Sequence, residues 1–209
     1  MYQNKNFFMK INVTNIFEAL KEEFTLLEKI ILVLLYLNRN QKIDNLRLTK
    51  MIFLISYDIK ELREELDFKI YKTKIYDQNI NDILDGLKQD GFIKIKNKNK
   101  YIVYIVLTES GIEEAEKILK DFSKKEIDIL EEVLDLFNGT TDDEVLAVFY
   151  FKIPGFSELS GPLPKIIKNR KKLAISLYKK GKISIGAASE IAGMNIKDFM
   201  EMLKKENLI

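Results

Sequence analysis

Many lysines of this chain are clustered in two segments, an arrangement typical of binding to a polyanion. Residues 165–209 carry eleven basic and four acidic side chains, a net charge of +7. A second basic set, Lys94, Lys96, Lys98 and Lys100, occupies alternate positions of one short segment. Ammonium groups gathered in this way bind the phosphates of a polyanion and release its counterions. Because residues 102–164 carry a net charge of −9, the basic and acidic segments could instead face each other, within the chain or across a dimer.

The residue types that most enzymes need are missing. The chain has no Cys and no His, which excludes disulfides, thiolate zinc sites, cysteine nucleophiles and histidine bases. Its nine glycines form no phosphate-cradling motif. We therefore expect no enzyme, no catalytic residue, no metal site and no cofactor. The one enzymatic alternative is Asp142-Asp143-Glu144 with a hard cation, although acidic residues are favoured in the first turn of any helix.

The 209 residues suffice for one large domain or two small ones. The most apolar run, Leu26–Leu37, spans twelve residues, whereas a membrane-spanning helix needs about 20. Met1–Lys10 contain no secretory apolar core. We expect a cytoplasmic protein without a membrane contact. Pro162 and Pro164 disfavour helix, which predicts a domain at 1–158, a linker at 159–164 and a second domain at 165–209.

The elements that must position the C-terminal lysines are three short helices, predicted at Lys165–Lys180, Ile185–Ala192 and Ile196–Asn207. Ala188 and Ser189 are small enough for two helices to cross closely, and Gly193 suits the turn between them. Ser184 and Asn195 are good N-caps for the second and third helices. This pattern predicts a helix-turn-helix module.

Such a module would bind DNA through its lysines and its helix ends. The predicted contacts are Lys171, Lys172, Lys179, Lys180, Lys182, Ser184, Asn195, Lys197 and Lys204, with Lys168 and Arg170 as further phosphate contacts. However, Ile196, Met200 and Glu201 also lie on the last helix and do not suit a DNA groove. The alternative is a protein-binding or dimerising helical module whose lysines keep it soluble.

The stretch from Arg170 to Met194 resembles a family of small prokaryotic helix-turn-helix proteins, many of them classed as antitoxin-like. The family's run ALELYREGKISLGKAAELAGMS…EFLELL matches nearly throughout residues 173–203. This resemblance covers about a fifth of the chain. It implies a DNA-binding or toxin-binding module and not an enzyme.

The order of elements before residue 110 is that of a winged helix. Helices are predicted at Asn15–Phe24, Leu26–Leu37, Leu46–Tyr57 and Ile80–Gln89, and strands at Phe68–Tyr76, Phe92–Lys96 and Tyr101–Leu107. The last two strands would form a hairpin wing whose four lysines, Lys94, Lys96, Lys98 and Lys100, contact DNA phosphates. The helix before the wing carries Asp77, Asp82, Asp85 and Asp90 on or beside it, against Lys88 alone. Carboxylates repel phosphate, so the winged helix docks either DNA or protein.

Residues 25–157 resemble the YwgA-like winged-helix family, which is similar to domains of antitoxins and protease adaptors. The matching motifs are Leu48–Leu54, Phe68–Asp77, Leu84–Ile93 and Leu107–Gly111, with a later likeness at Thr141–Phe156. The sequence departs from the family at Lys74-Ile75, where the family has Gly-Pro. Any role of that turn is therefore not carried over.

Two acidic helices are predicted after the wing, at Glu109–Asp121 and Lys124–Phe137, followed by a third helix at Asp142–Phe151. The acidic helices carry apolar stripes that either pack on the winged helix or form a homodimer. The predicted fold is mainly α, with a winged helix-turn-helix domain, a small β-hairpin wing and a C-terminal three-helix helix-turn-helix module. The predicted function is DNA binding by a dimeric transcriptional regulator or antitoxin-type repressor. The alternative is an interaction module whose acidic middle region binds a protein partner such as a toxin.

Overall fold

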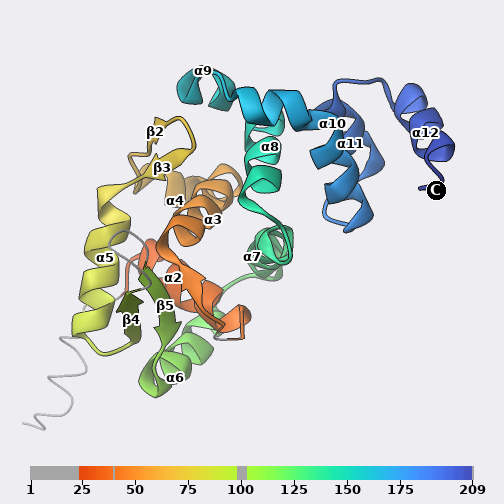
Figure 1. Cartoon of the computed structure of the whole chain (residues 1–209). Coiled ribbons are helices and arrows are strands. Elements are labelled where there is room, and N and C mark those ends of the chain that lie inside the picture. Colours follow the sequence, from red (N-terminus) through yellow and green to blue (C-terminus); the bar gives the residue numbers. More distant parts are fainter. Residues whose placement is uncertain (1–23, 40, 98–102, 209) are drawn as a thin grey trace, which may run out of the picture.

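The computed structural model describes residues 24–39, 41–97 and 103–208, which are mainly helical with a small antiparallel sheet (Figure 1). The first elements are α2 (Leu26–Leu37), β1 (Ile43–Asp44), α3 (Asn45–Asp58), α4 (Lys60–Glu64), β2 (Lys69–Tyr71), β3 (Lys74–Tyr76), α5 (Gln78–Gln89), β4 (Ile93–Asn97) and β5 (Val103–Leu107). Helices make up the rest: α6 (Glu109–Ile118), the 3₁₀ turn η1 (Leu119–Asp121), α7 (Lys124–Phe137), α8 (Asp142–Lys152), α9 (Phe156–Ser160), α10 (Pro164–Lys179), α11 (Ile185–Ala192) and α12 (Ile196–Lys205).

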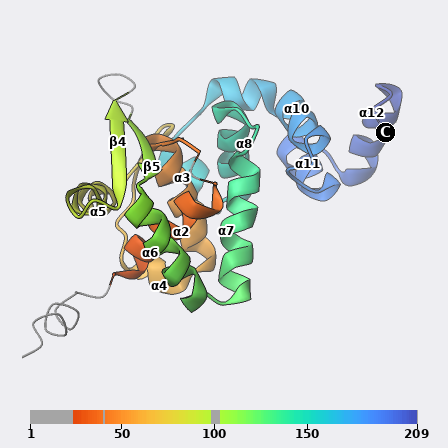
Figure 2. The same ribbon diagram turned by 90° about the horizontal axis from the view of Figure 1, so that it is seen from below.

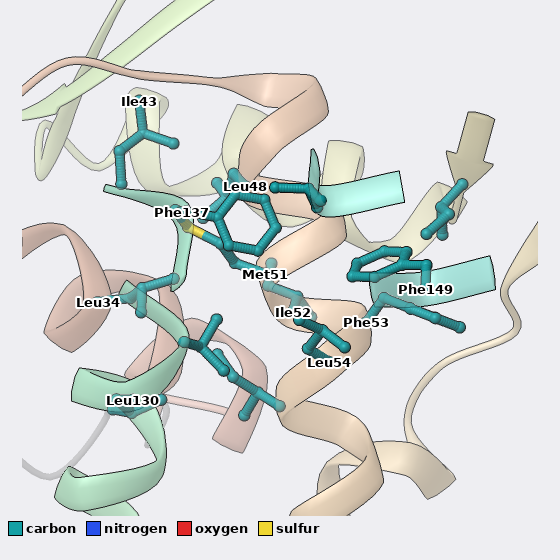
Figure 3. Packing of buried hydrophobic residues seen from close by; sticks show 14 of the residues in the cluster. Leu34, Ile43, Leu48, Met51, Ile52, Phe53, Leu54, Leu130, Phe137 and Phe149 are labelled. Atoms are coloured by element: carbon teal, nitrogen blue, oxygen red, sulfur yellow. The ribbon is translucent and has the colours of Figure 1, made fainter. Parts of the chain in front are cut away.

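Helix α2 forms the centre of the core. Six consecutive residues, 30 to 35, are fully buried, as expected for a helix that is apolar on all sides. Helices α3 and α7 pack beside it, and Figure 3 shows Leu34, Leu48, Met51, Leu130 and Phe137 gathered in this region. The predicted buried helices Leu26–Leu37 and Leu46–Tyr57 are thus present, with α3 one residue longer at each end.

The sheet has the strand order β1-β5-β4, with both pairs antiparallel. Ile95 of β4 lies opposite Ile105 of β5, and β1 joins the far side of β5 through Ile43. Alternation along β4 buries Ile93 and exposes Lys94 and Lys96. The predicted hairpin is therefore present, although its tip residues Lys98 and Lys100 lie outside the described residues.

The segment predicted as one strand, Phe68–Tyr76, is a hairpin. Strands β2 and β3 pair antiparallel, with Ile70 opposite Ile75. The turn between them places Lys72 at φ +54°. Lysine rarely adopts this left-handed conformation, so the residue types of the segment do not predict the turn. The short elements β1, α4 and α9 are also absent from the prediction. The predicted helix Asn15–Phe24 lies outside the described residues except for Phe24.

Side-chain caps fix most helix starts. Thr25, Ser123 and Thr141 each form a reciprocal capping box with the glutamate three residues later. Gly111, in the first turn of α6, lies so close to β4 that an added Cβ would be 2.0 Å from the Phe92 carbonyl oxygen. The start of α6 is thus held directly on the sheet. Within the described ranges, no helix has both the length and the apolar character to cross a membrane.

Helices α9 and α10 include three of the six residues of the predicted linker, 159–164. Helix α9 extends to Ser160 and α10 starts at Pro164, which leaves three residues between them. Helices α10 and α11 both pack against α8. The domain division thus remains a prediction, and the helices on its two sides are in contact.

Candidate nucleic-acid interface

The last three helices form a compact unit at one end of the molecule (Figures 1 and 2). Ala174 and Leu177 of α10 and Ala188 and Ile191 of α11 are buried where these helices pack. Phe199 and Leu203 are the buried residues of α12, which packs on α11. The outer side of α12 is consequently exposed.

Local hydrogen bonds cap the starts of α11 and α12. Ser184 Oγ accepts the N–H of Ala187 at 3.2 Å, and Asn195 Oδ1 accepts the N–H of Asp198 at 2.9 Å. Gly193 ends α11 at φ +71°, where glycine avoids the strain of a side chain. The predicted N-caps are therefore confirmed. Ser184 and Asn195, which were also predicted to bind DNA, cap the N-terminal ends of α11 and α12.

Arg170 is committed to packing within the chain. Its Nε and Nη2 donate to the carbonyl oxygens of Ile191 and Glu190 at 2.6 and 3.0 Å, which neutralises the C-terminal end of α11. Its guanidinium also lies 4.2 Å from the centre of the Phe151 ring in α8, a cation–π distance. The only arginine of the basic segment thus joins α11 to α8 and does not face a ligand.

Ion pairs connect the C-terminal helices to α7 and α8. Lys180 Nζ lies 2.8 Å from Glu144 and also donates to the Gly139 carbonyl oxygen. Lys182 Nζ lies 2.8 Å from Asp135. Further pairs join Lys165 to Asp143 and Lys152 to Glu190. Part of the charge asymmetry along the sequence is therefore balanced within the chain. Lys180 and Lys182, two of the predicted DNA contacts, form ion pairs with Glu144 and Asp135.

Glu144 is the most buried carboxylate of this junction, with 3% of its side chain exposed. Burial alone would raise its pKa, but hydrogen bonds from Lys180, Ser176 and Thr141 outweigh that effect and lower the pKa from 4.5 to about 2. Glu144 is therefore ionised at neutral pH and pairs with Lys180 as a charge.

Lysines without an acidic partner cover the opposite side of α10. Lys168, Lys171, Lys172 and Lys179 are exposed and share one helical face, because their spacings of three, four and eleven residues are close to whole turns. None of the four forms an ion pair with a carboxylate that the structure describes. We call this face the lysine stripe. All four of its lysines were predicted from the sequence as DNA or phosphate contacts.

The outer side of α12 carries a mixed set of side chains. Lys197 and Lys204 are exposed, together with Lys205 in the last turn. Ile196 and Met200 lie beside them with 47% and 37% of their surface exposed. The sequence prediction omitted Lys205, because it had no pattern besides charge to separate this residue from its neighbours.

The region predicted as a winged helix, which contains α5 and the β4–β5 hairpin, presents a different charge. Lys94 and Lys96 are exposed on β4, but the exposed residues of α5 include Asp82 and Asp85. Asp77, also predicted near this face, is buried and caps α5 by accepting the N–H of Ile80. Phosphate would therefore meet carboxylates on α5 beside the lysines of the wing.

The acidic first turn of α8 does not gather around one point. Asp142 pairs with Arg47 at 3.7 Å, Asp143 with Lys165 at 2.5 Å and Glu144 with Lys180. Across the described part of the chain, no three acidic side chains are grouped so that they could hold a metal ion.

The apolar stripes of α6 and α7 are largely used within the chain. Ala115 and Ile118 of α6, and Leu130, Val133 and Phe137 of α7, are buried in the core. Helix α6 packs on α2, and α7 packs on α3. Packing within the chain therefore accounts for most of the stripe residues.

Comparison with known proteins gives one result, confined to the C-terminal helices. Residues 166–208 match the uncharacterised protein family UPF0175. This match contains the run 173–203 in which the sequence resembles small helix-turn-helix proteins. No curated protein matches the chain, and no solved structure matches it.

Proposed function

We propose that the chain is a DNA-binding protein, a dimeric transcriptional regulator or antitoxin-type repressor that acts without enzymatic activity or a cofactor. The observation that carries the proposal is the lysine stripe of α10 together with Lys197, Lys204 and Lys205 of α12. These seven side chains are exposed and lack an acidic partner among the described residues. Such an arrangement suits DNA phosphates, whose neutralisation releases counterions.

The helix arrangement supports the same proposal. Helices α11 and α12, joined at Gly193, are arranged in the order of a helix-turn-helix, with α12 in the place of the helix that enters the major groove. We infer that the lysine stripe binds the DNA backbone and that Lys197 and Lys204 accompany α12 into the groove. Direct base readout is modest in this proposal, because bidentate arginine contacts to guanine are the commonest specific readout and Arg170 is engaged with α8 and α11.

A second role is proposed for the N-terminal region, residues 24–107. This role is supported by the sheet order β1-β5-β4 and by the helices α2, α3 and α5, which occur in the order expected of a winged helix; membership of the YwgA-like family is part of the proposal. Because Asp82 and Asp85 face solvent on α5, we infer that this end docks a protein partner, such as a toxin, more readily than DNA. Lys94 and Lys96 would then serve as secondary DNA contacts.

Salt-dependent DNA binding tests the main proposal. In Lys171→Glu/Lys172→Glu, two phosphate contacts are lost, so the log–log dependence of affinity on salt should become shallower by about 2, at roughly −0.9 per contact. Affinity at moderate salt should fall on the order of a hundredfold. The matched control is Lys120→Glu/Lys125→Glu, which makes the same charge change on exposed residues of η1 and α7. Equal losses in both variants would show that net charge, and not the lysine stripe, governs binding.

A further inference from the structure

A groove of about 850 Å³ lies between α7, the C-terminal ends of α3 and α8, and the turn that joins α10 to α11. Apolar side chains form its floor: Leu54, Val133 and Val148 are almost buried, and Ile153 and Ile183 are half-buried. A groove of this volume is large enough to receive several side chains. Its floor would gain stability from an apolar occupant.

One wall of the groove is acidic. Asp128, Glu131, Glu132 and Asp135 line it from two consecutive turns of α7, while Lys152 and Lys182 line the groove from the end of α8 and the turn after α10. Asp128 and Asp135 pair with lysines of the same chain. Glu131 and Glu132 are exposed and pair with no cation that the structure describes. An occupant must therefore combine apolar side chains with positive charge.

The outer face of α12 has this combination. Ile196 and Met200 are one turn apart and exposed, so they would be covered favourably by an apolar floor. Lys197 and Lys204 lie along one side of them, seven residues apart, with the exposed Glu201 between the two lysines. Seven residues of α-helix rise about 10.5 Å, the length of the α7 row from Asp128 to Asp135, in which Glu131 and Glu132 are the carboxylates without a described partner.

The chain cannot place its own α12 in this groove. Phe199 and Leu203 hold α12 on α11, so that its outer face points away from its own α7. In both views α12 lies at the end of the molecule, with α11 between it and α7 (Figures 1 and 2). The occupant must therefore come from another molecule.

We propose that the groove of one copy receives the outer face of α12 from a second copy. Ile196 and Met200 contact the apolar floor, and Lys197 and Lys204 lie along the acidic row of α7, as in other complexes of an amphipathic helix with a groove. Both complementary surfaces belong to this chain, which favours a second copy over an unrelated partner. If α12 also enters DNA, as proposed above, DNA and self-association compete for the same helix; this consequence rests on the proposed function, but the contact does not.

Two complementary charge reversals test the contact in the absence of DNA. The first variant is Lys197→Glu/Lys204→Glu, and the second is Glu131→Lys/Glu132→Lys. Each should self-associate about tenfold or more weakly than the unchanged chain, because like charges now meet. An equimolar mixture of the two should recover association, since the reversed α12 of the first fits the reversed groove of the second. The measurement is sedimentation velocity at low ionic strength over a wide range of protein concentration.

Lys205→Glu and Glu109→Lys serve as matched controls, because they change the same charges outside the contact and should leave association unaltered. Circular dichroism establishes that every variant is folded. A wild-type chain that stays monomeric at all concentrations, or a mixture that associates no better than its components, would overturn the proposal. DNA binding is measured in separate titrations, so its absence would refute the proposed function while leaving this contact standing.

Discussion

Helices α5 and α12 each bury one face and differ in what the other face exposes to solvent. Each buries one face: Ile80, Leu84 and Leu87 on α5, and Phe199 and Leu203 on α12. The exposed residues of α5 include two aspartates and one lysine, whereas those of α12 include three lysines, two acidic residues and two large apolar side chains. The comparison teaches that similar helix packing does not imply a similar ligand, because the outer face decides what each helix can bind.

The two regions also differ in how they are anchored. The N-terminal region is held by close packing, with Gly111 at the start of α6 against the carbonyl oxygen of Phe92, the residue before β4. The C-terminal helices are held by Arg170 on Phe151 and by Lys180 on Glu144. Substitutions that disturb packing should therefore destabilise the N-terminal region most. Changes of charge or pH should mainly weaken the contact between the C-terminal helices and α8.

The largest effect is expected from Gly111→Ala, at the contact between the start of α6 and Phe92. A Cβ at this position would lie 2.0 Å from the Phe92 carbonyl oxygen, so the backbone of α6 or β4 must move. We expect the free energy of unfolding to fall by about 3 kcal/mol or more, measured by urea denaturation. The control is Gly86→Ala in α5, where nothing lies within 4 Å; it should be neutral or stabilising by up to about 1 kcal/mol. Similar behaviour of both variants would contradict the close packing.

A somewhat smaller and pH-dependent effect is expected from Glu144→Gln at the junction. The folded pKa of Glu144, about 2, is below its ordinary value of 4.5. Its ionised form therefore stabilises the fold above pH 4.5, and this contribution disappears as the pH falls from 4.5 to about 2. At neutral pH we expect the substitution to cost about 3 kcal/mol.

Chemical denaturation of wild type and Glu144→Gln across this pH range measures that contribution. The difference between the two should shrink as the solution becomes more acidic. Asp143→Asn is the control at the same junction, since its partner Lys165 is 73% exposed, and it should cost less than about 1 kcal/mol. A difference that does not depend on pH would show that Glu144 acts through packing alone.

The smallest effect is expected from reversing the charge of α5. Asp82→Lys/Asp85→Lys, made in the Lys171→Glu/Lys172→Glu background, should raise DNA affinity about tenfold, because repulsion is replaced by phosphate attraction. Filter binding at low salt measures this gain. The matched change Glu109→Lys/Glu113→Lys on α6 controls for net charge. If the α5 and α6 charge reversals raise DNA affinity equally, the gain comes from net charge, and the outer face of α5 does not contact DNA.

Local signals in the sequence predicted most helices. Ser123 with Glu126 and Thr141 with Glu144 mark helix starts because each capping box involves only four consecutive residues. The β2–β3 turn was missed because it relies on Lys72 in a left-handed conformation, which no residue-type rule anticipates. Helices α4 and α9 were missed because five residues carry too little periodicity to detect.

The candidate interface was predicted less completely, because charge partners are not local. Lys180 and Lys182 were grouped with the DNA-binding lysines, but Glu144 and Asp135 lie 36 and 47 residues earlier in the chain. Arg170 pairs with carbonyl oxygens about 20 residues away. Only the fold can separate lysines that serve the junction from those of the lysine stripe.

The 36 residues that separate Glu144 from Lys180 also impose an order on synthesis. At roughly 5–20 residues per second, the ribosome needs about 2–7 s to add them. During that interval the elements up to α7 are already synthesised, while Glu144 has no partner from the C-terminal helices. The nascent chain should therefore fold these earlier elements first and dock the last three helices on α8 afterwards, so that the junction between Lys180 and Glu144 closes late in folding.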